Sequence, residues 1–315
     1  MAYRQGVVLV LMGAGVCHSA LAETGLSTSL ELGYRVDSLD WNIAGDTSGQ
    51  NPNILSELSW DHLVIPQVRI KLDGQMNDLH LLGEIAYGEV SDGDNQDSDY
   101  IFDNRQGEFS RSNNRAGGVV KDGTIGIGYR FATGVEGTRS SFVMPMAGYS
   151  IHQQNMKMTD GYQTVDLIND PPVLEPFPGL DSSYDAEWQS GWLGVRLVEA
   201  DAKEDLSIGM DIIYHWADYQ AEANWNLRTD FAHPKSFQHD AKGNGLVFSL
   251  NSVAKLSKRW DWIMGFDYSA WRAKPGVDTV YVVDEGDGSV SIAQTRLNEV
   301  NWESLAINLG VMLRL

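Results

Sequence analysis

The chain has 315 residues, with 43 acidic and 23 basic side chains and a formal net charge of −20. A charge of this sign repels nucleic-acid phosphates, so it excludes nucleic acid as a partner and favours cationic ones. After the N-terminal segment, no stretch approaches the ~18 consecutive apolar residues that a membrane helix needs. If the chain spans a membrane, it must do so as a β-barrel, because lipid leaves no other way to satisfy every backbone polar group.

The first 22 residues have the pattern of a secretory signal peptide. Arg4 supplies a positive charge, residues 7–12 are apolar, and Ala22 is a small residue at a position that a signal peptidase reads. The sequence therefore predicts cleavage before Glu23. Residues 23–315 remain as one domain, without the only cysteine of the chain.

Period-two alternation of apolar and polar residues recurs along the chain and predicts β-strands. The clearest segments are, in chain order, residues 124–131, 206–216, 260–269 and 304–315. Each has apolar side chains on one face and Gly, Ser, Asp, Asn or Arg among the residues of the other. Apolar outer faces with Trp and Tyr near the strand ends, around a polar lumen, are typical of an outer-membrane barrel.

Charged residues on the polar faces are expected to pair inside the lumen. The candidates are Arg130, Arg196, Asp211 and Asp267. His215 lies four residues after Asp211, about 13 Å away along an extended strand, which is too far for direct contact. We expect His215 to be a hydrogen-bonded histidine of the lumen.

The lengths of the polar connections predict the strand count. Long polar segments fall near residues 38–52, 91–118, 159–186, 223–243 and 275–300. Short ones fall near residues 74–78, 133–140, 201–205 and 256–259. Five long connections alternating with four short ones predict an all-β fold, a ten-stranded antiparallel transmembrane β-barrel. Its long loops would be extracellular and its short turns periplasmic, with both termini in the periplasm.

The last residues favour the same interpretation. Asn308, Gly310, Leu313 and Leu315 resemble the terminal signal that the outer-membrane assembly machinery reads, although many such proteins end in Phe. The expected partners are therefore outer-membrane lipid and, through the C-terminal strand, this assembly machinery. The expected location is the outer membrane of a Gram-negative-type bacterium.

The long polar segments are rich in acidic residues, and solvation alone explains many of them. Asp92 and Asp94, followed by Asp97 and Asp99, also offer oxygen ligands at close spacing for calcium, but they lack the full loop motif of a calcium site. We therefore predict no metal and no cofactor. Cationic peptides or proteins are the partners that an acidic surface would attract.

Several short motifs resemble the omptins, outer-membrane endopeptidases built on a ten-stranded barrel. Residues 38–41 and 58–61 look like the first-loop and second-strand pattern of that family. Residues 97–100, Asp-Ser-Asp-Tyr, are similar to its Asp-x-Asp-Trp motif in the second extracellular loop. Residues 242–250 and 260–274 look like its eighth and ninth strands.

The resemblance implies a catalytic site at the extracellular rim. In omptins an Asp pair faces an Asp-x-His pair of the fourth loop, and the His-side pair activates a water molecule. On that model Asp97 and Asp99 are the carboxylate pair, and Asp230 and His233 are the second pair. The spacing here is Asp-x-x-His, one residue longer than in the family, so the two side chains share a face only if the segment turns, as Pro234 favours.

The function and the identity of the base stay open at this point. His239 follows in the same polar segment and is an alternative base to His233. The chain is either a surface endopeptidase that acts on basic peptides or a non-catalytic barrel that serves as adhesin, receptor or structural protein. A general porin fits less well, because ten strands leave little lumen once side chains fill it. An omptin-type lipid A site is not supported, because residues 149–153 lack the expected Arg.

Overall fold

The computed structural model describes residues 24–284 and 286–315, so the predicted signal peptide lies outside the described residues. The described part consists of strands joined by turns and irregular segments, which confirms the prediction of an all-β fold. Within it, no helix is long and apolar enough to cross a membrane.

Thirteen strands occur in the described residues. They are β1 (Thr24–Ile43), β2 (Ser56–Met76), β3 (Leu79–Glu89), β4 (Asp92–Phe102), β5 (Gln106–Tyr129), β6 (Phe131–Glu136), β7 (Arg139–Asp166), β8 (Ser182–Asp201), β9 (Leu206–Asn224), β10 (Phe237–Lys255), β11 (Trp260–Ala273), β12 (Gly276–Val283) and β13 (Val290–Arg314).

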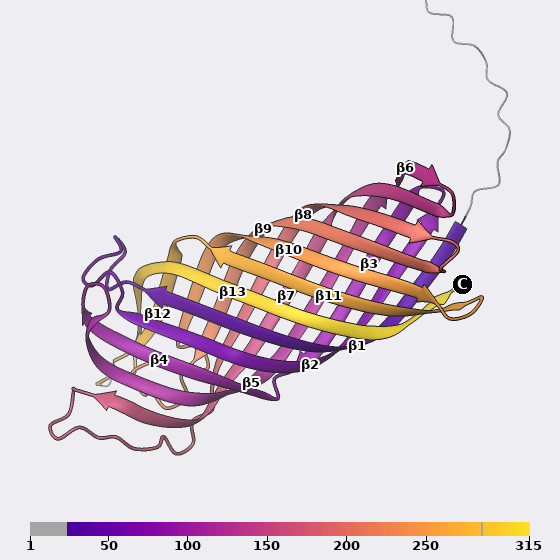
Figure 1. The fold of residues 1–315 in the computed structure, drawn as a ribbon. Coiled ribbons are helices and arrows are strands. Elements are labelled where there is room, and N and C mark those ends of the chain that lie inside the picture. The colour runs from indigo at the N-terminus through magenta and orange to yellow at the C-terminus, as the bar shows by residue number, and fades with distance from the viewer. Residues whose placement is uncertain (1–23, 285) are drawn as a thin grey trace, which may run out of the picture.

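Ten of these strands pair antiparallel into a closed ring, and the ring forms a β-barrel (Figure 1). The order around it is β1-β2-β3-β5-β7-β8-β9-β10-β11-β13 and back to β1. The other three described strands follow ring strands along the chain and pair beside them. β4 follows β3 and lies between β2 and β5, β12 follows β11 and lies between β10 and β13, and β6 follows β5 and pairs with β7. The predicted number of ten strands is therefore found.

The two ends of the barrel differ (Figure 1). The C-terminus, β6 and the start of β1 lie at one end, here called the termini end. β4 and β12 lie at the other, here called the loop end. The connections at the termini end are residues 77–78, 137–138, 202–205 and 256–259. All four fall inside the segments predicted to be short turns.

The predicted long loops are wrong in extent. The irregular connections at the loop end are residues 44–55, 103–105, 167–181, 225–236 and, without residue 285, 284–289. Most of the predicted loop 91–118 belongs to β4 and β5, and most of 275–300 belongs to β12 and β13. The strands extend far past the apolar outer band, and their polar outward residues look like loop residues in the sequence.

The apolar face changes sides along a strand, as β9 shows. Near the termini end Ile208, Ile212 and Trp216 point outward and are exposed, whereas Asp211 and His215 point inward and are buried. Near the loop end the pattern is reversed. The outward residues there are Asp218, Gln220 and Glu222, and the inward ones are Ala217, Tyr219, Ala221 and Ala223. The termini half is therefore apolar outside, and the loop half is apolar inside.

The main hydrophobic core fills the loop half of the barrel. Its largest members are Leu39, Trp41, Leu58, Trp60, Tyr184, Trp188, Tyr219, Phe237, Trp271 and Trp302. Burying each large side chain of this kind contributes roughly 1.5–3 kcal/mol relative to exposure. The core holds the strand ends of the loop half in fixed positions and so orients the side chains at the rim.

Candidate functional site

Asp97 and Asp99 lie on β4 at the loop end and point inward. Asp97 is paired across the sheet with Leu58 of β2, and Asp99 is paired with Ser56. Leu58 is fully buried in the core, and directly opposed residues share a face of the sheet, so both carboxylates belong to the inner face of the rim. The sequence motif thus brings two acids together above the core.

The environment of this pair favours a bound proton. Burial, and next the charge of Asp99, raise the pKa of Asp97 to about 8, against the lowering effects of Arg228 and of hydrogen bonds from Trp225 and Ser56. Burial also raises the pKa of Asp99, whose carboxylate accepts hydrogen bonds from the hydroxyls of Ser56 and Ser110. Two carboxyl groups in one low-dielectric place do not both ionise easily, and the pair titrates as a unit.

Arg228 is the cation that faces the carboxylate pair. It comes from the irregular segment 225–236, and its charge acts on both Asp97 and Asp99. Its Nε and Nη2 donate hydrogen bonds of 2.8 and 2.6 Å to the two oxygens of Asp230. These bonds lower the pKa of Asp230 and raise that of Arg228. Asp230 is thus the partner of an arginine.

His233 is engaged away from the acids. Its Nδ1 lies 2.7 Å from Oδ1 of Asn224, and its Nε2 lies 2.9 Å from the backbone oxygen of Arg228. No hydrogen bond or ion pair links His233 with Asp230, Asp97 or Asp99 among the described residues. Arg228 therefore connects Asp97, Asp99 and Asp230, whereas the predicted base His233 is bonded to the end of β9 and to the backbone of its own segment.

The alternative base, His239, does have an acidic neighbour. Its Nε2 lies 3.4 Å from Oδ1 of Asp278 on β12, and its Nδ1 lies 2.8 Å from the hydroxyl of Tyr184. The imidazole has no exposed surface and packs edge-on against Trp41, with ring centroids 4.8 Å apart. Asp278 was not among the predicted site residues, because only the register of β10 and β12 places it opposite His239.

Tryptophan rings fill the lumen below the rim. Trp271 and Trp302 stack with centroids 5.3 Å apart, and Trp188 lies 5.7 Å from Trp271. Gly245 makes room for this layer, because a Cβ there would lie 2.5 Å from the ring of Trp271. His152 and His215 contact the underside of the layer, with centroids 4.9 and 4.6 Å from that of Trp271.

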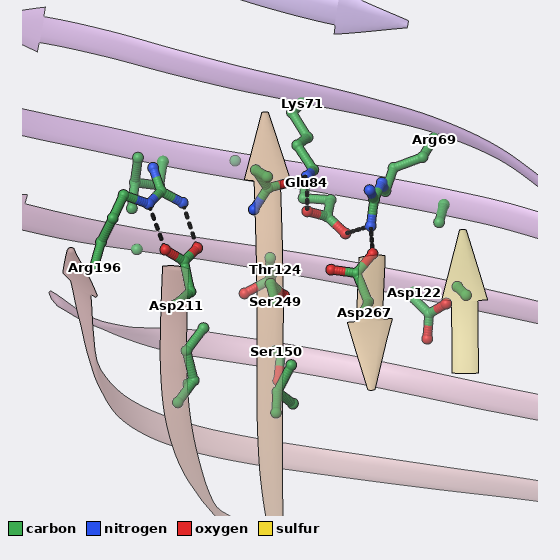
Figure 2. A pocket seen from close by; sticks show the side chains of 18 of the residues that line it. Arg69, Lys71, Glu84, Asp122, Thr124, Ser150, Arg196, Asp211, Ser249 and Asp267 are labelled. Carbon is green, nitrogen blue, oxygen red and sulfur yellow. Dashed lines mark hydrogen bonds and ion pairs between the residues drawn. The ribbon is translucent and has the colours of Figure 1, made fainter. Parts of the chain in front are cut away.

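A polar cavity of about 450 Å³ lies in the termini half, and Trp192, Trp271 and Trp302 are among the residues that line it. Figure 2 shows the charged and hydroxyl side chains of its wall. Its wall carries ion pairs, as predicted for the lumen. Arg196 binds Asp211 through two hydrogen bonds of 2.8 and 2.7 Å, and Arg69 binds Asp267 at 2.6 Å. The prediction for Arg130 differs, since it pairs with Asp78 in the first turn.

Calcium ligands do not converge in the described residues. Asp92 and Asp94 are exposed on the outer face of β4, whereas Asp97 and Asp99 are on the inner face. No group of three or more His, Cys, Asp or Glu side chains in this part of the chain is arranged to hold a metal ion.

Comparison with known proteins shows a family and a similar fold. A model of the family described as Pom, Protochlamydia outer membrane protein, matches residues 29–315. The outer membrane protease OmpT from Escherichia coli has a TM-score of 0.69 and 12% sequence identity, with 92% of this chain and 97% of that chain covered. At this identity the likeness shows the fold alone, and it confirms the resemblance to omptins at that level.

Other barrels are less similar. The translocator domain of the autotransporter NalP from Neisseria meningitidis has a TM-score of 0.36 and 10% identity, covering 94% of this chain and 90% of that one. The outer membrane protein OprG from Pseudomonas aeruginosa has a TM-score of 0.28 and 9% identity, covering 91% of this chain and 96% of that one. The comparison with curated proteins finds no match.

Proposed function

Because this chain belongs to the Pom family of Protochlamydia outer membrane proteins and is an outer-membrane β-barrel, we propose that it acts as a surface protein whose acidic rim binds cationic peptides or proteins without cleaving them. In this proposal the loop end faces the cell exterior, and the short turns and both termini face the periplasm. The apolar outer band of the termini half contacts lipid, and β13 serves as the strand that the assembly machinery reads.

The observation that carries this proposal is the position of His233. A general base needs a free imidazole nitrogen that points at the reacting water, and an acid that orients the ring through the other nitrogen. Both nitrogens of His233 have partners, Asn224 and the Arg228 carbonyl, and Asp230 binds Arg228. Among the described residues, the rim therefore has carboxylates for holding a cation, and Asp230 and His233 are not paired for activating water.

The choice of a cationic ligand rests on charge. The chain has a net charge of −20, and the positive charge of Arg228 acts on both Asp97 and Asp99. An arginine or lysine side chain of a ligand could take the place of Arg228 beside the pair. Electrostatic attraction of this kind increases association rates and weakens with salt.

The test uses the refolded mature chain and a fluorogenic peptide that contains an Arg-Arg bond. We expect the chain to bind this peptide without cleaving it. Combined D97N and D99N should weaken binding by roughly 2–30-fold, because each partly exposed ion pair contributes about 0.2–1 kcal/mol. The matched control, D92N with D94N on the outer face of β4, should change binding less. Equal losses in the two double variants would contradict a rim site.

The second candidate is a surface endopeptidase acting on basic peptides through Asp97, Asp99, Asp230 and His233. It is favoured by the carboxylate pair, whose raised pKa suits a group that holds a proton or a water near neutral pH. Turnover of the Arg-Arg peptide that is lost in H233A and kept in H239A would establish this function. Loss in H239A alone would identify the buried histidine as the base.

A further inference from the structure

A serine, a histidine and an aspartate form a hydrogen-bonded series on the wall of the polar cavity, away from the rim. Ser150 and His152 are two residues apart on β7 and share its inner face. His152 is directly paired with Asp122 of β5. The Nδ1 of His152 lies 2.8 Å from Oδ1 of Asp122, and its Nε2 lies 3.1 Å from Oγ of Ser150.

The atoms are connected in the order that nucleophilic catalysis by a serine requires. With a proton on Nδ1, His152 donates to Asp122 and can accept the Ser150 proton at Nε2. Asp122 is fixed by Arg35, whose Nη1 donates a hydrogen bond of 2.7 Å to its other oxygen. Ser190, paired with Ser150 across the sheet, lies 2.8 Å from it and supports its hydroxyl.

Trp271 provides an independent sign of a ligand site here. It is 3% exposed and lines the cavity, and its Nε1 has no hydrogen-bond partner among the described residues. A buried N–H without a partner costs about 1–3 kcal/mol, so a ligand oxygen that accepts from it would be favoured. Its ring contacts both His152 and His215, which puts this donor beside the series.

The cavity has the size and lining of a small-molecule site. Its volume of about 450 Å³ lies within the range of ligand pockets. Figure 2 shows Ser150 and Asp122 among the residues of its wall. The apolar part of the lining includes Leu82, Ile213, Val247, Val253 and Ile263. The side chains of His152 and Asp122 are 16% and 15% exposed, and Ser150, which is 1% exposed, also lines the cavity.

We propose that Ser150, His152 and Asp122 form an esterase site inside the barrel, which binds an acyl ester with its chain against the apolar lining. Ser150 Oγ attacks the ester carbonyl carbon, and its proton moves to Nε2 of His152. The N–H of Trp271 donates to the oxyanion that forms. The bond to the alcohol oxygen then breaks, the alcohol leaves with the proton of His152, and the acyl group remains on Ser150.

A water molecule completes the reaction. His152 takes a proton from this water as it attacks the acyl carbon, and returns the proton to Ser150 Oγ as that bond breaks. The products are a carboxylic acid and an alcohol, and Ser150 and His152 return to their starting protonation states. The ester and one water molecule are the only reactants. The rim acids take no part in these steps.

The test combines a fluorophosphonate probe with hydrolysis of p-nitrophenyl butyrate by the refolded mature chain. We expect the probe to attach to Ser150, as located by mass spectrometry, and both signals to disappear in S150A. H152Q should slow hydrolysis by about 100-fold or more, the usual loss when a general base is removed. S249A, which removes a hydroxyl from the same cavity wall, is the matched control and should keep both signals.

The location of the label on the wild-type chain decides the result even if S150A does not fold. A heat-dependent shift in gel mobility shows which variants form a barrel. Folded wild-type protein that is not labelled at Ser150, or hydrolysis that is equal in folded wild type and folded S150A, would overturn the proposal.

Discussion

The two halves of the barrel place their apolar side chains on opposite faces of the same strands. In the termini half β9 has Ile212 outside and Asp211 inside, and in the loop half it has Gln220 outside and Tyr219 inside. The termini half is suited to lipid around a polar lumen, and the loop half is suited to water around an apolar core. One continuous strand therefore has its apolar face toward lipid in one half and toward the protein core in the other.

Because of this difference, the interiors of the two halves are suited to different functions. The apolar core of the loop half is a rigid support for the acids at the rim. The polar lumen of the termini half leaves a cavity, since ion pairs and hydroxyls line it without filling it. The tryptophan layer thus lies between the proposed binding site at the rim and the proposed esterase site inside the barrel.

The largest expected effect comes from opening the core of the loop half. Trp60 is fully buried and stacks with Tyr184, with ring centroids 5.1 Å apart. W60A should lower the free energy of unfolding by about 3–5 kcal/mol, because it leaves a cavity. W216A, which removes an outward ring of the termini half, should cost clearly less. Urea titration in lipid vesicles measures the free energy of unfolding of both variants. Equal losses would contradict the claim that the tryptophans of the core stabilise the barrel more than those of the outer face.

The next effect concerns ion pairs. D211A would leave Arg196 without its partner in the polar lumen, at a cost of roughly 2–4 kcal/mol, toward the low side of buried pairs because Arg196 is partly exposed. D218A breaks the exposed pair with Lys242 on the outer face of the loop half, at a cost of about 0–1 kcal/mol. The same titration should rank them in this order, and the reverse order would contradict the assignment of faces.

A smaller effect is expected from pH. The pKa of Asp97 is raised in the folded chain, so the folded state binds more protons than the unfolded state between pH 4 and about 8. The stabilisation from this group is therefore complete at low pH and is lost as pH rises through about 8. D97N should gain about 1 kcal/mol relative to wild type between pH 5 and pH 8, after discounting for partial exposure.

The control for this pH dependence is D46N. The pKa of Asp46 is lowered to about 2 by hydrogen bonds from Ser48 and Asn51, so its contribution to stability changes only as the pH falls from about 4 through about 2. The difference between D46N and wild type should therefore stay constant from pH 5 to pH 8. A difference between D97N and wild type that stays constant from pH 5 to pH 8 would show that Asp97 ionises in the usual range.

Much of the fold could be predicted from the sequence because lipid imposes a strict alternation. The four clearest segments lie in strands of the described residues, and the four short turns were located. The loop half was harder, because alternation with a polar outer face is also expected of solvated loops. The strand extensions in 91–118 and 275–300 were therefore predicted to be irregular.

The sites depended on contacts between distant segments. The Asp97 and Asp99 pair follows from spacing on one strand. The engagement of His233 by Asn224 depends on how residues 225–236 fold back, which no local pattern determines. Likewise, Ser150 and His152 share a face by their spacing, but Asp122 joins them only through the register of β5 and β7.

The most direct test of the change of faces is one substitution made at two outward positions of β9. I212R puts a charge on the apolar outer face of the termini half, and Q220R puts the same charge on the polar outer face of the loop half. In urea titrations of the protein in lipid vesicles, I212R should cost about 2–4 kcal/mol, as for arginine in the lipid-facing band of a barrel. Q220R should change stability by less than about 0.5 kcal/mol, as for an exposed surface position. Equal costs at the two positions would contradict the account.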